Sequence, residues 1–201
     1  MVHPTVRLVL CLALPVLLLG CLSVETRIEM EDSRRGELTY IFTLSRELLE
    51  AQVFDRDAEV WPVPIARRDF ELMDHALPEA ELLEYSREDG EEESVVTAVY
   101  RFDSLEALAR LLSTRDSLEL PAGGVGLKLP LSPAEVSDLG EGELAFLESY
   151  FDRGTITYRI ETPSPILESS LGEPSGRTLR LDYTFRELLD RSEPLELELV
   201  W

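Results

Sequence analysis

Few side chains in this 201-residue sequence have the types and spacing that enzyme chemistry needs. His75 is the single histidine after residue 20 and stands beside Asp74, but a triad also needs a nucleophile and an orienting group at set distances. The segment Gly172–Gly176 has the wrong spacing for a Gly-x-Ser-x-Gly elbow, and no Ser-x-x-Lys motif precedes Lys128. We therefore expect no serine hydrolase chemistry, no catalytic residue and no cofactor.

Metal-binding motifs are incomplete. Three alternating acids have the spacing that begins a calcium loop: Asp55, Asp57 and Glu59. However, Val60 stands where the EF-hand turn needs glycine, and Ala66 stands where the bidentate glutamate belongs. The acidic segment Glu88–Glu93 could attract a hard cation but is favoured as a solvated hairpin tip, and Gly123–Gly126 lacks the third glycine of a dinucleotide fingerprint. We predict no metal site.

The charge balance excludes a further class. The chain has 19 Lys and Arg against 40 Asp and Glu, a net charge of -21, whereas nucleic-acid binding requires a dense basic surface. Arg7 is the only charged residue among residues 1–20, so the remaining 18 basic and all 40 acidic residues fall in 21–201. Two cysteines are too few for a disulfide scaffold, and 44% hydrophobic residues are too many for a disordered acidic chain. A folded domain that binds no nucleic acid is expected.

The N-terminus has the pattern of a processing segment. Arg7 precedes the apolar run Leu8–Leu19, which is shorter than the ~20 residues that span a bilayer, so residues 1–20 are predicted to be a secretory signal. The tetrad Leu18-Leu19-Gly20-Cys21 resembles the lipobox of bacterial lipoproteins. In that family the cysteine thiol accepts a diacylglycerol group before the signal is removed. The resemblance implies lipid attachment at Cys21, while a plain secretory signal or an uncleaved anchor is the alternative.

The same resemblance implies a location. Cys11 lies within the predicted signal, so Cys21 would be the only cysteine of the mature protein, with its sulfur carrying lipid. Leu22 follows it at the position where aspartate favours retention in the inner membrane of some bacteria. We therefore expect a protein that is tethered in the cell envelope without spanning a bilayer, at the outer membrane or on the periplasmic side.

Apolar residues alternate with polar ones over several segments, the pattern of strands with one wet face. The predicted strands and hairpins are 22–31 with 38–45, 82–87 with 94–103, and 154–162, 177–185 and 195–201. Short helices are predicted at 46–52, 69–76, 104–114, 144–151 and 186–191. Asp103 is expected to cap the third of these helices, with Glu106 completing a capping box.

One domain follows from these elements. Residues 21–201 are predicted to form a single α+β domain in which antiparallel β-hairpins make a curved sheet packed against short helices, with a loop-rich insert at 117–150. In the loop 163–176, Ile166 and Leu167 are expected to point inward. Aromatic residues on the inward strand faces belong to the core by default: Tyr40, Phe42, Tyr100, Phe102, Tyr158, Tyr183 and Phe185.

Three segments together resemble the LppM-type envelope lipoproteins: Leu22–Ile28 directly after the cysteine, Val99–Leu108 and Tyr158–Ser170. This sequence departs from that family at the insert 117–150, and the single membrane-spanning C-terminal helix usual in the family is missing from it. The resemblance implies an α+β lipoprotein domain with suggested lipid binding, and it transfers no catalytic residue.

Three functions remain open. The first is a lipid-anchored, non-catalytic binding or assembly module, whose partners would be the membrane, through Cys21, and an envelope protein or lipid ligand. The second is a carrier of an apolar ligand or lipid held among the inward aromatics. The third is a hydrolase of envelope glycans that uses two carboxylates about 5–9.5 Å apart, which forty acidic residues leave possible.

Overall fold

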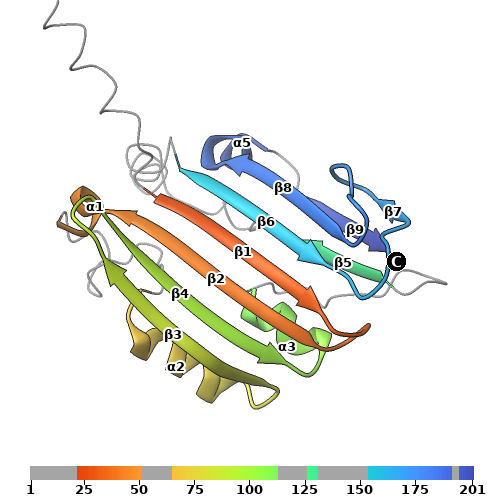
Figure 1. Cartoon of the computed structure of the whole chain (residues 1–201), viewed down its shortest axis with the longest axis horizontal. Coiled ribbons are helices and arrows are strands. Elements are labelled where there is room, and N and C mark those ends of the chain that lie inside the picture. Colours follow the sequence, from red (N-terminus) through yellow and green to blue (C-terminus); the bar gives the residue numbers. More distant parts are fainter. Residues whose placement is uncertain (1–21, 51–64, 113–125, 131–153, 192–194) are drawn as a thin grey trace, which may run out of the picture.

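The computed structural model describes residues 22–50, 65–112, 126–130, 154–191 and 195–201. Its main element is a six-stranded sheet with the order β3-β4-β2-β1-β6-β8 (Figure 1). The strands are β1 (Leu22–Met30), β2 (Gly36–Ser45), β3 (Ala80–Asp89), β4 (Glu93–Phe102), β6 (Thr155–Glu161) and β8 (Thr178–Thr184). A second sheet has the order β5-β9-β7, with β5 (Gly126–Pro130), β7 (Glu168–Ser169) and β9 (Glu196–Val200).

The fold is α+β, as predicted, and the two N-terminal hairpins form at the predicted places. β1 pairs antiparallel with β2, and β3 pairs antiparallel with β4. β1 also pairs with β6, and this pairing is parallel, which local hydrophobic patterns do not specify. The parallel pairing joins the two N-terminal hairpins to the β6–β8 pair, so segments more than a hundred residues apart share one sheet.

The turn of the first hairpin is held by Asp32. Its Oδ1 accepts hydrogen bonds from the backbone N–H of Arg34 at 2.8 Å and of Arg35 at 2.9 Å, and the Arg35 guanidinium donates to Oδ2. The two backbone bonds, followed by the Arg35 guanidinium, lower the pKa of Asp32 to about 2. This network positions Gly36, the first residue of β2, opposite its cross-strand partner Met30.

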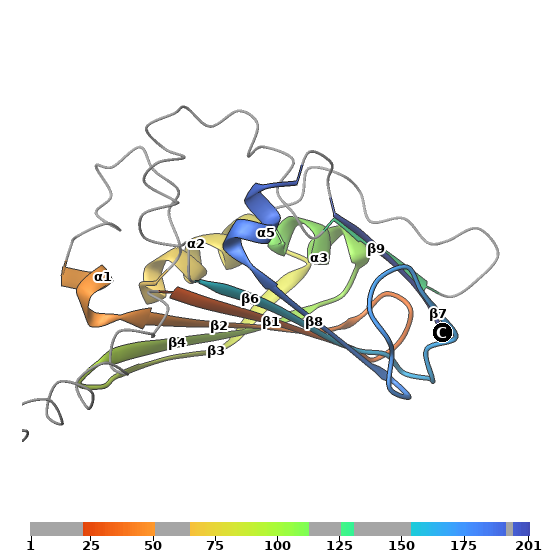
Figure 2. The same cartoon turned by 90° about the horizontal axis from the view of Figure 1, so that it is seen from above.

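One face of the six-stranded sheet is covered and the other is open (Figure 2). The helices α2 (Arg67–Ala76), α3 (Leu105–Leu111) and α5 (Phe185–Leu189) lie on the same side of the sheet as β9, while α1 (Arg46–Glu50) continues from the end of β2. The alternate residues of β4 that face the helices are fully buried: Val96, Ala98, Tyr100 and Phe102. The helices therefore close the core from one side, which leaves the opposite face of the sheet uncovered by any described element.

Tyrosine hydroxyls tie the sheet to the helices. Tyr100 donates to the carbonyl oxygen of Phe70 in α2 at 2.8 Å, and Tyr40 donates to that of Leu111 at the end of α3 at 2.7 Å. Burial raises the pKa of Tyr40 well above its usual value. These hydroxyls act as neutral donors, and the Tyr40 bond satisfies a carbonyl that the last turn of α3 leaves without a helical partner.

The predicted cap of α3 is wrong by one residue. Ser104, not Asp103, is the N-cap, because its Oγ accepts the N–H of Ala107 at 3.1 Å. Asp103 instead donates its backbone N–H to the carbonyl oxygen of Glu79 at 3.0 Å and so belongs to the strand edge. Leu108 and Leu111 of this helix are buried, while Leu105 and Leu112 are half-buried.

Two strands were not predicted. β5 lies inside the segment expected to be loop-rich, and it pairs with β9. The two-residue β7 also pairs with β9, and the N–H of Leu167 bonds to Val200 at 2.7 Å. The expectation that Leu167 points inward is wrong, because its side chain is 72% exposed beside this pairing, whereas Ile166 is half-buried. The predicted helix 144–151 lies outside the described residues.

Candidate functional site

The open face of the six-stranded sheet is polar. Strand alternation places on it the charged residues of β1, β6 and β8, and threonine or β-branched apolar residues at the centre of β2 and β4. The central group consists of Thr39, Ile41, Thr43, Val95, Thr97 and Val99. All six side chains are half-buried within the sheet surface. Glu81, Glu84 and Glu88 of β3 lie on the same face beyond β4. This face is therefore a broad surface that carries charged residues on both sides of a β-branched group.

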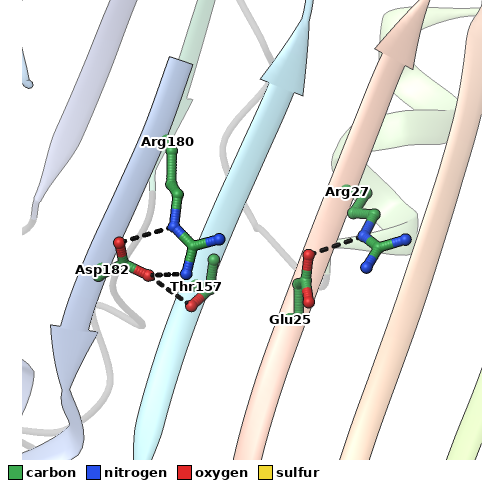
Figure 3. A network of polar contacts seen from close by, with 5 residues as sticks. All are labelled: Glu25, Arg27, Thr157, Arg180 and Asp182. Atoms are coloured by element: carbon green, nitrogen blue, oxygen red, sulfur yellow. Dashed lines mark hydrogen bonds and ion pairs between the residues drawn. The ribbon is translucent and has the colours of Figure 1, made fainter. Parts of the chain in front are cut away.

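Two groups of hydrogen-bonded side chains form a polar network on this face, one joining β6 and β8 and the other on β1 (Figure 3). The guanidinium of Arg180 donates to both carboxylate oxygens of Asp182, each at 2.8 Å, and Thr157 Oγ1 donates to Asp182 at 2.7 Å. On β1, Arg27 Nε donates to Glu25 at 2.7 Å. Figure 3 shows these side chains on the near side of the strands, with a helix behind them. The network is thus on the open face and outside the core.

The electrostatics of this network keep Asp182 charged. The hydrogen bonds from Arg180 and then from Thr157 lower the pKa of Asp182. The bond that Arg27 donates to Glu25 raises the pKa of Arg27, and the bonds that Arg180 donates to Asp182 raise the pKa of Arg180. These shifts stabilise charged forms, whereas a general acid in glycoside hydrolysis requires a raised carboxyl pKa.

A second row of charges lies one step further along the strands. Glu29 is the cross-strand partner of both Glu37 and Glu161. Arg101 pairs with Glu37 at 3.7 Å, and Arg177 pairs with Glu161 at 2.7 Å. A depression of about 290 Å³ is lined here by Glu29, Met30, Glu31, Glu37, Glu161, Thr162 and Arg177. Arg101 and Arg177 therefore partly neutralise Glu37 and Glu161. In the described part of the chain, no group of three or more His, Cys, Asp or Glu is placed to hold a metal ion.

Other candidate residues from the sequence lie apart. His75 is exposed at the end of α2, where its Nδ1 donates to the carbonyl oxygen of Glu71 at 2.6 Å. At the acidic hairpin tip, the carboxylate of Asp89 accepts bonds from Arg87 and Ser94. Cys21 and the segment containing Asp55 and its two neighbouring acids lie outside the described residues. The structure therefore does not bring His75 to the open face.

The network residues were not singled out from the sequence. Their one local sign is the pairing of an arginine and an acid two residues apart on the same strand, which occurs at Glu25–Arg27 and at Arg180–Asp182. Such spacing puts both side chains on one face of a strand. It does not reveal that β6 lies between these two strands.

A solved structure is similar to this chain in fold. No protein-family model matches the chain, and no curated protein is similar to it in sequence. The folded domain of Mycobacterium tuberculosis LppM, solved by NMR, is similar to this chain. The two are 12% identical with a TM-score of 0.49, over 90% of this chain and 88% of that one. Within the described residues, no helix has the length and apolar character needed to cross a membrane.

Proposed function

We propose that this protein is a lipid-anchored protein of the cell envelope whose domain is a non-catalytic binding module, with the open sheet face as its binding surface. The observation that carries the binding role is the asymmetry of the six-stranded sheet, which has helices on one face and a hydrogen-bonded polar network on the other. The lipobox-like tetrad ending at Cys21 supports the anchor. A single acyl chain binds a bilayer only marginally, whereas the diacylglycerol group that lipoproteins carry on this cysteine supplies two acyl chains, enough for stable anchoring.

The start of β1 supports a close tether. β1 begins at Leu22, the residue that follows the predicted lipid-carrying cysteine. Leu44 of β2 is the cross-strand partner of Leu22, and Ser94 of β4 is the partner of Leu44. The beginning of β4 and the acidic hairpin tip therefore lie at the anchored end of the sheet. With no linker between the lipid and the strand, the anchored end of the open face would lie close to the membrane surface.

Two observations favour this reading over the alternatives. Each described carboxyl group with a shifted pKa, namely Asp32, Asp89, Asp182 and Glu187, has it lowered, which is the wrong direction for a glycosidase acid. For an apolar-ligand carrier, the inward aromatics would have to line a cavity. The ring of Phe70 instead packs between those of Phe42, Tyr85 and Tyr100, with centroids 5.5–6.5 Å apart.

Replacing the predicted lipid-carrying cysteine tests the anchor. We expect Cys21→Ser to move the protein from the membrane fraction to the soluble fraction and to abolish incorporation of labelled fatty acid, because serine offers no thiol to the acyl transfer. The measurement is fractionation of cells together with metabolic labelling. Unchanged fractionation and unchanged labelling would show that the protein is not a lipoprotein.

Cysteine labelling tests the open face. Thr97 lies at the centre of that face, whereas Leu72 is 57% exposed on α2, on the covered side of the sheet. We expect maleimide to react several-fold more slowly with Thr97→Cys in isolated envelopes than in the purified protein, because a bound partner shields the face. Leu72→Cys is the control and should react at similar rates in both preparations. Equal rates in both preparations for Thr97→Cys would refute the binding surface.

A further inference from the structure

Three arginines lie side by side on the open face. Arg159 of β6 is the cross-strand partner of Arg27 of β1 on one side and of Arg180 of β8 on the other. Neighbouring strands are about 4.8 Å apart, and like charges directly opposite one another destabilise a sheet. The chain has only 19 basic residues against 40 acidic ones, so an acid could readily have stood at the middle position. We name these three residues the arginine row.

The members of the row differ in their partners. Arg27 is held by Glu25 at 2.7 Å, and Arg180 is held by Asp182 at 2.8 Å. Arg159 is exposed and forms no hydrogen bond or ion pair with any residue that the structure describes. Its guanidinium therefore retains five N–H donors for a ligand, at the centre of the row.

Most of the acids near the row are already engaged. Glu25 and Asp182 accept bonds from the outer arginines, and Glu161, two residues along β6, is paired with Arg177 at 2.7 Å. Glu29 of β1, two residues beyond Arg27, is the one neighbouring acid of this face for which the described residues show no ion pair. Acids farther away act over longer distances, where salt screening with a Debye length of about 8 Å weakens them at physiological ionic strength. A compact anion at Arg159 thus experiences mainly the three neighbouring guanidinium groups.

We propose that the arginine row binds a phosphate group, with Arg159 as its main ligand. The planar fork of a guanidinium matches two oxygens of a phosphate, and the further oxygens of the same group can reach the guanidinium groups on the neighbouring strands. Bound phosphate would also relieve the repulsion among the three arginines. This inference rests on the proposed function, since it assigns a ligand chemistry to the same open face.

The position of the row bears on the source of the phosphate. Arg27 is five residues beyond Leu22, which places the row about 17 Å along the strand from the anchored end. That distance favours a phosphate carried by a soluble molecule over the headgroups of the anchoring bilayer when the strands rise from the membrane. A lipid phosphate reaches the row only if the open face lies down on the bilayer.

The test is NMR of the full-length lipidated protein with arginine Nε–Hε signals as the readout. In detergent micelles, inorganic phosphate is expected to shift the signals of the arginine row saturably. Arg159→Gln should weaken this binding at least about tenfold, because it removes charge-assisted hydrogen bonds. Arg159→Lys, which keeps the charge but loses the fork, should weaken it less. Arg68→Gln is the matched control, since Arg68 is exposed on α2 and has no polar partner among the described residues.

The outcomes are distinct. A soluble source is indicated if the row responds only to added phosphate, and a lipid source if the row is already shifted in phosphatidylglycerol nanodiscs without it. No saturable shift in either preparation, or equal weakening by Arg68→Gln and Arg159→Gln, would overturn the phosphate site. Anchoring and shielding of the open face are measured separately, so a tethered, shielded protein without a phosphate response would refute only this inference.

Discussion

Replacing Phe70 with alanine is expected to lower the free energy of unfolding by about 3–5 kcal/mol. Phe70 is fully buried on α2, and its ring lies 5.5 Å from that of Tyr85 and 6.4 Å from that of Phe42. Removing the ring leaves a cavity between the helix and the covered face of the sheet, which the surrounding strands can fill only in part. For a single domain this is a large share of the usual 5–15 kcal/mol of stability.

Denaturant unfolding followed by circular dichroism measures this change. Leu72→Ala is the control, because Leu72 is on the same helix but 57% exposed, and we expect a change of at most about 0.5 kcal/mol. If both variants lose the same small amount of stability, α2 does not seal the core as described, and the packed core that argues against an apolar-ligand carrier would lose its support.

Replacing Gly36 with alanine is expected to destabilise the first hairpin by about 1–3 kcal/mol, with the upper end favoured. A Cβ at this position would stand 2.1 Å from the carbonyl oxygen of Glu29, which is backbone of the adjacent strand and has little freedom to move. The ring of Phe102 blocks the other side at 3.0 Å. The strand pair must therefore separate at this end, next to the cross-strand pair of Glu29 and Glu37 on the open face.

Gly176 offers a control of a different kind. Its φ of 62° is left-handed, but an added Cβ would meet no atom within 4 Å. Gly176→Ala should therefore lower the free energy of unfolding only by the conformational cost of a left-handed alanine, about 1–2 kcal/mol. Urea titration of both variants compares steric with conformational effects. A smaller loss for Gly36→Ala than for Gly176→Ala would mean that β1 and β2 are not as closely paired at this turn.

Much of the fold could be predicted because its signals are local. Alternation at Val96, Ala98 and Tyr100 gives the inward face of β4, since side chains on a strand point to opposite sides in turn. The helices after β2 and β8 could also be predicted from local sequence. The structure shows that α5, the helix after β8, begins with a capping box of Thr184 and Glu187. The cap of α3 was misplaced by one residue because Asp103 and Ser104 are both good capping residues, and only the pairing of Asp103 with Glu79 separates them.

The short strands of the second sheet were missed for the opposite reason. β7 has two residues and β5 has five, so neither gives a periodic signal of useful length. Both are strands because β9 provides hydrogen-bond partners on each side. Leu167 likewise gave no sign of its exposure, since an apolar residue in a loop points inward or outward according to the neighbouring pairing.

The sequence by itself determined the lipobox-like tetrad at Cys21, the acidity of the domain and the polar side of each strand. The tertiary structure alone decided which polar sides share a surface. Arg27 and Arg159 are 132 positions apart, and they become neighbours only because β1 and β6 pair in parallel with one particular register. Each strand would keep its alternation under any even shift of that register. Only packing across the sheet selects the register that places three arginines in one row.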